Sequence, residues 1–356
     1  MKILFEHQHL YYLPQFEPII QELKRREVEG IYGSLSESVP ELEKKLFKKE
    51  MERLGVELVG ANFEPQRRRI IKDMNFDLIF VGNKTSLGAI KAKNSFSIMI
   101  YHGIGLKQSY YTDLTNDMDL VCVESPVRDA QLQDMGFNSV ETGLTKLDLL
   151  ETMDYDSQDQ TSRPSILYAP TFFPSSLQKS IPFLKKMATF KIQIKLHHFF
   201  WTEPKYGIIR QELEDVIKNL DHVYLCPFED YNILKHFPSA DLLVSDFSST
   251  LFEFLMVNKP IVQATYFSRR FKYRLFPHLL EKRMDREREM MINFTLKCDT
   301  PDKLSDLIGL GLSNHEDLSS QRLNACKEFL GEVDGKASQR VVNAIIESGI
   351  PIGHRG

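Results

Sequence analysis

Residues 241–254 read DLLVSDFSSTLFEF, and this stretch decides the interpretation of the fold. An apolar run at 241–245 leads directly into a turn rich in hydroxyl side chains, and apolar residues at helical spacing follow. A short buried strand that runs into a helix is typical of a parallel α/β sheet, whose ligands bind beyond the carboxyl ends of the strands. We therefore expect the functional residues in the loops that follow strands.

The same alternation of short apolar runs and helical patterns extends through the rest of the chain. Apolar strands separated by helices indicate a parallel sheet that helices cover on both faces. We expect strands in the second half at 165–169, 191–197, 222–225, 241–245 and 260–264, and in the first half at 2–6, 56–60, 77–81, 96–101, 119–124 and 139–142. Helices are expected at 16–27, at 40–54 and in the tail at 334–348.

The pattern divides the chain into two domains. A length of 356 residues suits two domains of roughly 150 residues each. The polar segment Met153–Pro164 lacks apolar periodicity and is predicted to be the linker. We expect a Rossmann-like domain at 1–152, a second at 165–335, and a C-terminal helix and tail at 336–356 that can pack back on the first domain.

Composition excludes several classes of protein. With 45 basic and 49 acidic residues, the net charge of −4 gives no reason to expect nucleic-acid binding. The four cysteines form no CxxC and fit no zinc motif, so we expect reduced thiols. No Asp-rich ligand cluster appears at the strand ends where function is expected, so we expect no metal, and we expect no cofactor. No signal peptide and no apolar window of roughly 18 residues occurs, which predicts a cytoplasmic protein, or a peripheral one on the inner face of the cell membrane.

The hydroxyl-rich turn at Ser248, Ser249 and Thr250 is a candidate phosphate site. Small side chains and backbone N–H groups at the start of a helix bind anions by hydrogen bonds and by the helix dipole. Helix capping is the alternative, but it needs only one hydroxyl.

Two other strand ends carry histidines. Tyr101-His102-Gly103-Ile-Gly105-Leu-Lys107 places a histidine and two glycines directly after a strand, where His102 can act as a general base. A tight turn with an incidental histidine is the alternative. At Lys195-Leu-His197-His198, one histidine can donate to a phosphate oxygen, and the alternative is a pair of surface histidines.

Taken in order, these stretches resemble the motif series of the CDP-glycerol glycerophosphotransferases, the family of teichoic-acid primases and polymerases. The resemblance covers about residues 95–348. His102 to Lys107 matches HGxGxK, Tyr168 to Thr171 matches YAPT, Lys195 and His197 match a basic residue and a histidine, Ala240 to Ser249 is similar to ADxLITDYSS, Asp334 to Ser338 is similar to DGxAS, and Gly143 to Asp148 approaches GxPRxD. Thr145, Lys146 and Phe247 depart from these patterns.

The resemblance implies a GT-B fold, in which two Rossmann-like parallel-sheet domains face a central cleft. It implies transfer of glycerol phosphate, or a similar polyol phosphate, from CDP-glycerol or a related donor to a lipid-linked or polymeric hydroxyl acceptor, with release of CMP. His102 and His197 would be catalytic, and Ser248, Ser249, Thr250 and Lys195 would bind the donor phosphates. Thr171, Pro227, Phe228 and Glu229 would contact the nucleotide, and Gly103, Gly105, Lys107 and His7 would lie on the acceptor side.

Other interpretations stay open on the sequence alone. A glycosyltransferase or nucleotide-sugar 2-epimerase of the same fold would use an NDP-sugar, and a nucleotide-binding paralogue would have no activity. The runs Arg67–Arg69 and Arg269–Arg288 are expected to be solvated, and an anionic membrane surface is a further candidate partner for them. Asp113 and Asp117 are candidates for orienting His102.

Overall fold

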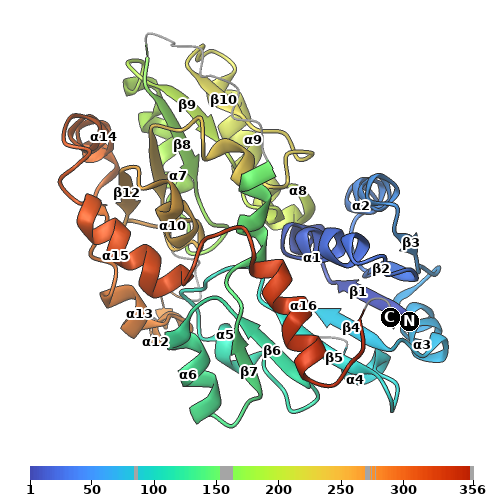
Figure 1. Ribbon diagram of the computed structural model, residues 1–356. Helices are drawn as coiled ribbons and strands as arrows, with labels where there is room; N and C mark the ends of the chain where they lie inside the picture. The colour runs from blue at the N-terminus through green and yellow to red at the C-terminus, as the bar shows by residue number, and fades with distance from the viewer. Residues whose placement is uncertain (84–86, 153–162, 269–272, 274, 277, 353–356) are drawn as a thin grey trace. The chain divides into compact units, whose positions relative to one another are not determined.

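The computed structural model describes residues 1–83, 87–152, 163–268, 273, 275, 276 and 278–352, and it shows two compact units (Figure 1). Unit 1 comprises Met1–His102, Tyr110–Thr152 and Glu328–Gly356, and unit 2 comprises Gly103–Ser109 and Met153–Lys327. The chain therefore leaves unit 1 directly after His102, contributes a short loop to unit 2 and returns to unit 1 at Tyr110.

Unit 1 is built on a seven-stranded sheet in the order β3-β2-β1-β4-β5-β6-β7, and every neighbouring pair is parallel. The strands are β1 Ile3–His7, β2 Ile31–Leu35, β3 Glu57–Leu58, β4 Leu78–Val81, β5 Phe96–Ile100, β6 Leu120–Val123 and β7 Ser139–Glu141. Its helical segments are η1 Leu10–Tyr12, α1 Leu13–Arg25, α2 Glu41–Leu54, α3 Glu64–Met74, α4 Leu87–Ile90, α5 Ser109–Thr112, α6 Pro126–Asp134, η2 Thr145–Thr152 and α16 Ala337–Glu347. Because β1 lies between β2 and β4, the loop after β1 lies at the middle of the carboxyl edge.

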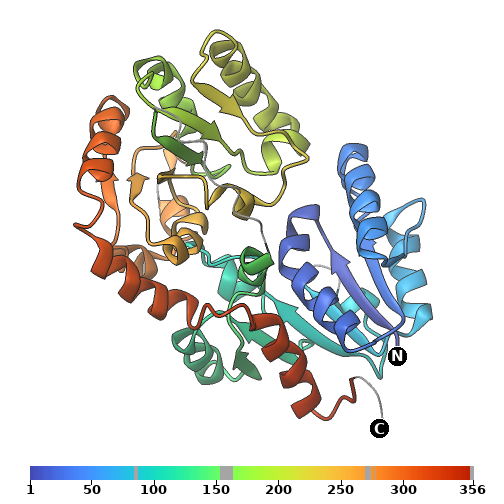
Figure 2. The ribbon, with the colours of Figure 1, turned by 45° about the horizontal axis from the view of Figure 1, so that its top comes forward.

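The last helix of the chain packs on the first. α16 contacts α1, and Arg26 donates a hydrogen bond of 2.7 Å to the side chain of Asn343 (Figure 2). Both helices are amphipathic: α1 buries Leu13, Phe16 and Ile20, which fall on one face at helical spacing. The C-terminal helix is thus an integral part of the core of unit 1.

Unit 2 is built on a six-stranded parallel sheet in the order β10-β9-β8-β11-β12-β13. The strands are β8 Ser165–Ala169, β9 Lys191–Ile194, β10 Val223–Leu225, β11 Leu242–Ser245, β12 Ile261–Ala264 and β13 Leu296–Cys298. Its helical segments are α7 Leu177–Ser180, η3 Ile181–Lys186, α8 Phe199–Thr202, α9 Pro204–Ile217, η4 Ile233–His236, α10 Thr250–Glu253, η5 Phe254–Val257, α12 His278–Glu281, α13 Arg286–Met290, η6 Pro301–Lys303, α14 Leu304–Ser313 and α15 Ser319–Leu330, which continues into unit 1.

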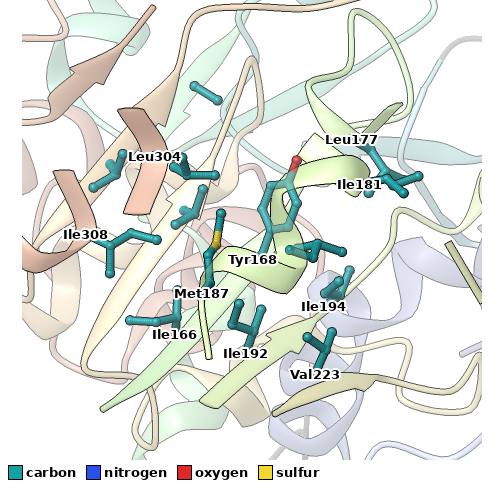
Figure 3. Close-up of a cluster of buried hydrophobic side chains, with 14 of the residues drawn as sticks. Ile166, Tyr168, Leu177, Ile181, Met187, Ile192, Ile194, Val223, Leu304 and Ile308 are labelled. Atoms are coloured by element: carbon teal, nitrogen blue, oxygen red, sulfur yellow. The ribbon is translucent and has the colours of Figure 1, made fainter. Parts of the chain in front are cut away.

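The core of unit 2 lies against its two central strands, β8 and β11. Figure 3 shows the ring of Tyr168 among aliphatic side chains from β9, α7 and η3, with its hydroxyl at one end of the cluster. That hydroxyl is 2.9 Å from Ser176 Oγ and donates to Ser180 Oγ at 3.0 Å, so the buried polar atom is satisfied.

The predicted fold class is confirmed, since both units are parallel α/β sheets. Two strands were missed: β2, whose sequence IYGSL carries a glycine, and β13, which has only three residues. The strand expected at 56–60 is reduced to two exposed residues at the sheet edge, Glu57 and Leu58. The helix expected after β11 is only four residues long and continues as the 3₁₀ turn η5.

The interpretation of Arg67–Arg69 as a solvated run is wrong for Arg67. Its side chain is 0% exposed and donates to Glu6 Oε1 at 3.0 Å, to Glu64 Oε1 at 2.6 Å and to Ser34 Oγ at 3.1 Å. Burial alone would raise the pKa of Glu64, but hydrogen bonds from Arg67 and Arg68 lower it to about 2. The network ties α3 to the carboxyl ends of β1 and β2.

Arg67→Met should destabilise the protein by about 3–5 kcal/mol, because it leaves the buried carboxylate of Glu6 without its cation. Arg69→Met is the matched control on the same helix: its side chain is 85% exposed, and we expect a change within about 0.5 kcal/mol. Urea unfolding of both variants measures the difference. Equal stability of the two variants would contradict the assignment of Arg67 to the core.

Candidate functional site

The glycine-rich motif after β5 is divided between the two units. His102 belongs to unit 1, and Gly103–Ser109, which we call the docking loop, packs on unit 2. Gln108 N–H donates to Arg283 O at 3.0 Å, and Asp285 N–H donates to Leu106 O at 3.0 Å. Lys107 and Met284 form an antiparallel bridge between them. Backbone hydrogen bonds therefore fix the docking loop on the segment between α12 and α13.

The docking loop also lies on the hydroxyl-rich turn after β11. A Cβ placed on Gly103 would be 2.9 Å from Ser249 Oγ and 3.1 Å from Glu253 Oε1. Any larger residue would force these side chains to shift, because real Cβ contacts below 3.0 Å essentially do not occur. The two motifs are nearly 150 residues apart in the chain, and the structure brings them together.

Lys107 joins the docking loop to a second pair of predicted residues. Its Nζ lies 4.4 Å from the centre of the Phe172 ring, within the range of a cation–π interaction. The same ring lies 4.5 Å from the imidazole of His197, whose Nδ1 accepts a hydrogen bond of 3.2 Å from Phe199 N–H. Lys107 and His197 therefore contact the same aromatic ring, although the sequence placed Lys107 on the acceptor side. Phe172 follows the YAPT stretch and was missed.

Asp246 is the buried centre of the site in unit 2. Its side chain is fully buried, and it accepts hydrogen bonds of 2.8 Å from Thr171 N–H, Ser176 N–H and Ser176 Oγ. Burial raises the pKa of Asp246 to about 6, and the hydrogen bonds and the charge of Lys107 act in the opposite direction. The carboxylate thus holds the turn after β8 against the end of β11. This role of Asp246 was not predicted from the sequence, although an aspartate directly after a buried strand is a visible signal.

The hydroxyl-rich turn differs from the expectation in one respect. α10 has only four residues, so its dipole is small, and hydrogen bonding is left as the main source of anion affinity. Ser249 occupies the N-cap position, yet its side chain makes no capping hydrogen bond. Ser248 Oγ lies 3.0 Å from Thr250 Oγ1 and accepts from Thr250 N–H at 3.3 Å. Helix capping therefore accounts for the Ser248 hydroxyl. It does not account for the Ser249 hydroxyl, which lies beside Gly103.

Lys195 and the loop after β10 differ in their burial. Burial lowers the pKa of Lys195 to about 8, and its Nζ donates to the adjacent carbonyl of Leu196 at 3.2 Å. Phe228 is buried, with its ring 5.2 Å from that of His198. Pro227 is half-buried and Glu229 is exposed. The predicted contacts of Lys195 with phosphate, and of these loop residues with the nucleotide, stay predictions.

The expectation that His7 contacts the acceptor is corrected. His7 is 0% exposed, and its ring lies 4.9 Å from Phe16 and 4.8 Å from Phe47. Its Nδ1 pairs with Phe5 O at 2.9 Å, and burial lowers its pKa to about 3. His7 is a neutral residue of the core of unit 1.

Two of the motifs that resemble the family are structural. Asp148, from the stretch Gly143 to Asp148, accepts hydrogen bonds from Ala337 N–H at 3.1 Å and Ser338 N–H at 2.7 Å. Arg340 donates to Thr142 O at 2.8 Å from within α16. The stretches 143–148 and 334–338 therefore meet in unit 1, where they fix the beginning of α16.

The basic stretch Arg269–Arg288 lies partly outside the described residues, which omit 269–272, 274 and 277. Within the described part, Arg286 pairs with Glu281 and Glu289, and Arg288 is buried. Of the described basic side chains there, Lys282, Arg283 and Arg286 are exposed, and Arg283 donates a hydrogen bond of 2.8 Å to the Tyr273 hydroxyl. Contact with an anionic membrane surface stays a prediction.

Gly103→Ala should destabilise unit 2 by about 1–3 kcal/mol, because its Cβ would be forced against Ser249 and Glu253. Gly207→Ala is the matched control: nothing lies within 4 Å of the added Cβ, and alanine in a helix should add about 0.5–1 kcal/mol. Denaturant unfolding compares the two. A Gly103→Ala variant as stable as wild type would show that the docking loop does not pack on this turn.

Comparisons with known proteins agree with the motif series. A family model described as CDP-Glycerol:Poly(glycerophosphate) glycerophosphotransferase matches residues 74–347, most of the chain. The teichoic acid glycerol-phosphate primase of Bacillus subtilis (strain 168) is 31% identical over 102 residues, which are 28% of this chain and 25% of the primase. The match thus spans only about a quarter of that relative's length.

Solved structures show the same fold. The wall teichoic acid polymerase TagF, in a form soaked with CDPG, has a TM-score of 0.67 at 17% identity, with 98% of this chain and 88% of that chain covered. The UDP-GlcNAc 2-epimerase from Neisseria meningitidis, bound to UDP-GlcNAc, has a TM-score of 0.59 at 14% identity and covers 98% of this chain and 100% of its own. These likenesses establish the fold alone, and the family is established by the match over residues 74–347. The chain belongs to the CDP-glycerol:poly(glycerophosphate) glycerophosphotransferase family.

Proposed function

We propose that this chain transfers glycerol phosphate, or a similar polyol phosphate, from a CDP-activated donor to a hydroxyl acceptor in the synthesis of a cell-surface polymer. One observation carries the proposal. Gly103 packs on Ser249, and His102 is the residue bonded to Gly103. The candidate base therefore directly precedes, in the chain, the residue that packs on the hydroxyl-rich turn, and this supports the proposal that both act in one reaction.

The donor diphosphate would bind at the hydroxyl-rich turn of unit 2. Ser249 offers its hydroxyl. Lys107 and His197 both contact the ring of Phe172, which holds the two side chains near each other. A lysine and an imidazole can each donate to phosphate oxygens and offset their negative charge. Asp246 would act indirectly, because it holds the backbone of Thr171 and Ser176.

The reaction would proceed by direct displacement at the β-phosphorus of the donor. The acceptor oxygen forms a bond to this phosphorus while its proton passes to His102. The bond from the phosphorus to the bridging oxygen breaks, and CMP leaves with that oxygen. Positioning and charge stabilisation supply most of the acceleration in phosphoryl transfer, so Lys107 and His197 would act mainly on the developing negative charge.

The nucleotide product tests this function against its rivals. With CDP-glycerol and a glycerol-phosphate acceptor, we expect CMP as the released nucleotide, and cytidine nucleotides should raise the melting temperature more than uridine or guanosine nucleotides do. A glycosyltransferase or a 2-epimerase would instead release a nucleoside diphosphate or convert an NDP-sugar. Turnover of a UDP-sugar without turnover of any CDP-polyol would contradict the proposal, and cytidine binding with no turnover would favour an inactive paralogue.

The place of action is also part of the proposal. Among the described residues, no helix has the length and apolar character needed to cross a bilayer. We infer action at the cytoplasmic face of the membrane, with contact through the stretch around Lys282 and Arg283, beside which Phe276 is half exposed. Sedimentation with liposomes that shows no dependence on anionic lipid would exclude this contact.

His102→Ala and Ser249→Ala should have separable effects. Loss of a general base should lower turnover by a factor of roughly 10²–10⁴ and leave donor affinity nearly unchanged. Loss of a hydroxyl that binds a charged phosphate should weaken the donor complex by roughly 1–3 kcal/mol. Calorimetric donor binding and single-turnover CMP release, measured on the same preparations, distinguish the two.

His315→Ala and Ser320→Ala serve as controls, because both residues are exposed outside the candidate site, and neither quantity should change. Full turnover in folded His102→Ala would contradict the proposed mechanism. Loss of donor binding in the same variant would instead assign His102 to the phosphate site.

A further inference from the structure

We infer that Tyr12 is a positioning residue for His102. Its ring fixes the plane of the imidazole that takes up the proton of the acceptor hydroxyl. The inference rests on the proposed function, because it needs His102 to act as the base. It concerns contacts within unit 1 alone.

Three tyrosine rings contact the imidazole of His102. Tyr12 is stacked on it, with ring centres 4.9 Å apart and planes 22° from parallel. Tyr11 meets it edge-on at 5.3 Å, and Tyr110 lies at 6.0 Å. Of the three, Tyr12 covers the face of the imidazole and is the most deeply buried, at 2% exposed. A stacked ring restricts rotation of the imidazole about its Cβ–Cγ bond, which edge contacts alone would not do.

Tyr12 is itself held at both ends of its ring. A Cβ on Gly82 would lie 2.7 Å from Tyr12 Cδ2 and 2.9 Å from Cε2, so the ring packs directly on the backbone of Gly82, where a larger residue would collide with it. At the far end, Asn83 Nδ2 donates a hydrogen bond of 2.7 Å to the hydroxyl of Tyr12. Burial raises the pKa of Tyr12 well above its ordinary value, so the hydroxyl stays neutral. The ring therefore has one available orientation.

The strand order explains why these residues meet. β1, β4 and β5 are consecutive in the sheet. Tyr12 lies in the connection after β1, Gly82 and Asn83 follow β4, and His102 follows β5. Three adjacent strand ends thus supply the imidazole, the ring stacked on it and the group that anchors that ring. The suggestion from the sequence that Asp113 and Asp117 orient His102 stays a prediction.

A fixed imidazole matters because proton transfer depends on direction as well as distance. If Tyr12 acts through the position of His102, its removal should lower the rate of the chemical step and leave donor binding unchanged. If Tyr12 only stabilised unit 1, its removal would lower the stability of the protein without a selective loss in the rate of the chemical step. The stacked ring, rather than the hydroxyl, is predicted to carry most of the effect.

The test compares Tyr12→Leu, Tyr12→Phe and Gly82→Ala in single-turnover CMP release from CDP-glycerol, with donor affinity and unfolding measured alongside. Tyr12→Leu should lower the rate by about 10- to 100-fold, the range for a small misplacement of a reacting group, at unchanged donor affinity. Tyr12→Phe keeps the stacked ring and should recover most of the rate. Gly82→Ala pushes a methyl group into the ring and should resemble Tyr12→Leu, and it decides the matter if Tyr12→Leu does not fold.

Tyr32→Leu is the control, since Tyr32 packs on Phe76 in the same unit at 5.3 Å. It should cost stability and leave the rate unchanged. If the wild-type protein turns over and the folded Tyr12→Leu and Gly82→Ala variants do so at the same rate, the inference is overturned and the proposed function stands. Wild-type protein that releases no CMP from any CDP-polyol would contradict the proposed function instead.

Discussion

The approach of Gly103 to Ser249 is the constraint on which the rest of the site depends. A Cβ added at Gly103 would lie 2.9 Å from Ser249 Oγ and 3.1 Å from Glu253 Oε1, so these side chains would have to move. This contact sits where the chain passes from one unit to the other, since His102 belongs to unit 1 and Gly103 to unit 2. His102 is the last residue of unit 1 before this loop, and it is bonded directly to Gly103. Lys107, four residues further along the same loop, contacts the ring of Phe172, and its charge acts to lower the pKa of Asp246.

Each side of this contact is stiffened by a different physical device. In unit 2 it is a buried carboxylate: Asp246 accepts three hydrogen bonds of 2.8 Å and joins the turn after β8 to the end of β11. In unit 1 it is aromatic packing, in which Tyr12 covers one face of His102 and is anchored by Asn83. The Asp246 carboxylate and the Tyr12 hydroxyl each have hydrogen-bond partners, as a rigid site requires. Neither device touches substrate in the proposed mechanism, and both keep the groups that do so in place.

The sequence predicted the fold class and most strand positions because parallel strands are short, apolar and regularly spaced. It missed β2, whose run IYGSL is interrupted by a glycine, and β13, which has only the three residues LKC. It also pointed to the strand ends on which the proposed function rests, at His102, His197 and Ser249, since polar residues after apolar runs are a local signal. The contacts made by Tyr12, Phe172 and Asp246 depend on strand order and on side-chain packing, which local patterns do not contain. Likewise, the complete burial of His7 identifies it as a core residue, unlike His102 and His197. A hydropathy pattern does not distinguish a buried histidine after a strand from an accessible one.

The central claim is that the docking loop and the turn after β11 form one donor site, although they are far apart in the chain. A crystal structure of the protein with CDP-glycerol tests this most directly. The account predicts the diphosphate within hydrogen-bond distance of the Ser249 hydroxyl, with the side chains of Lys107 and His197 directed at its oxygens and Gly103 still packed on Ser249. A diphosphate bound elsewhere, with the contact between Gly103 and Ser249 unchanged, would contradict it.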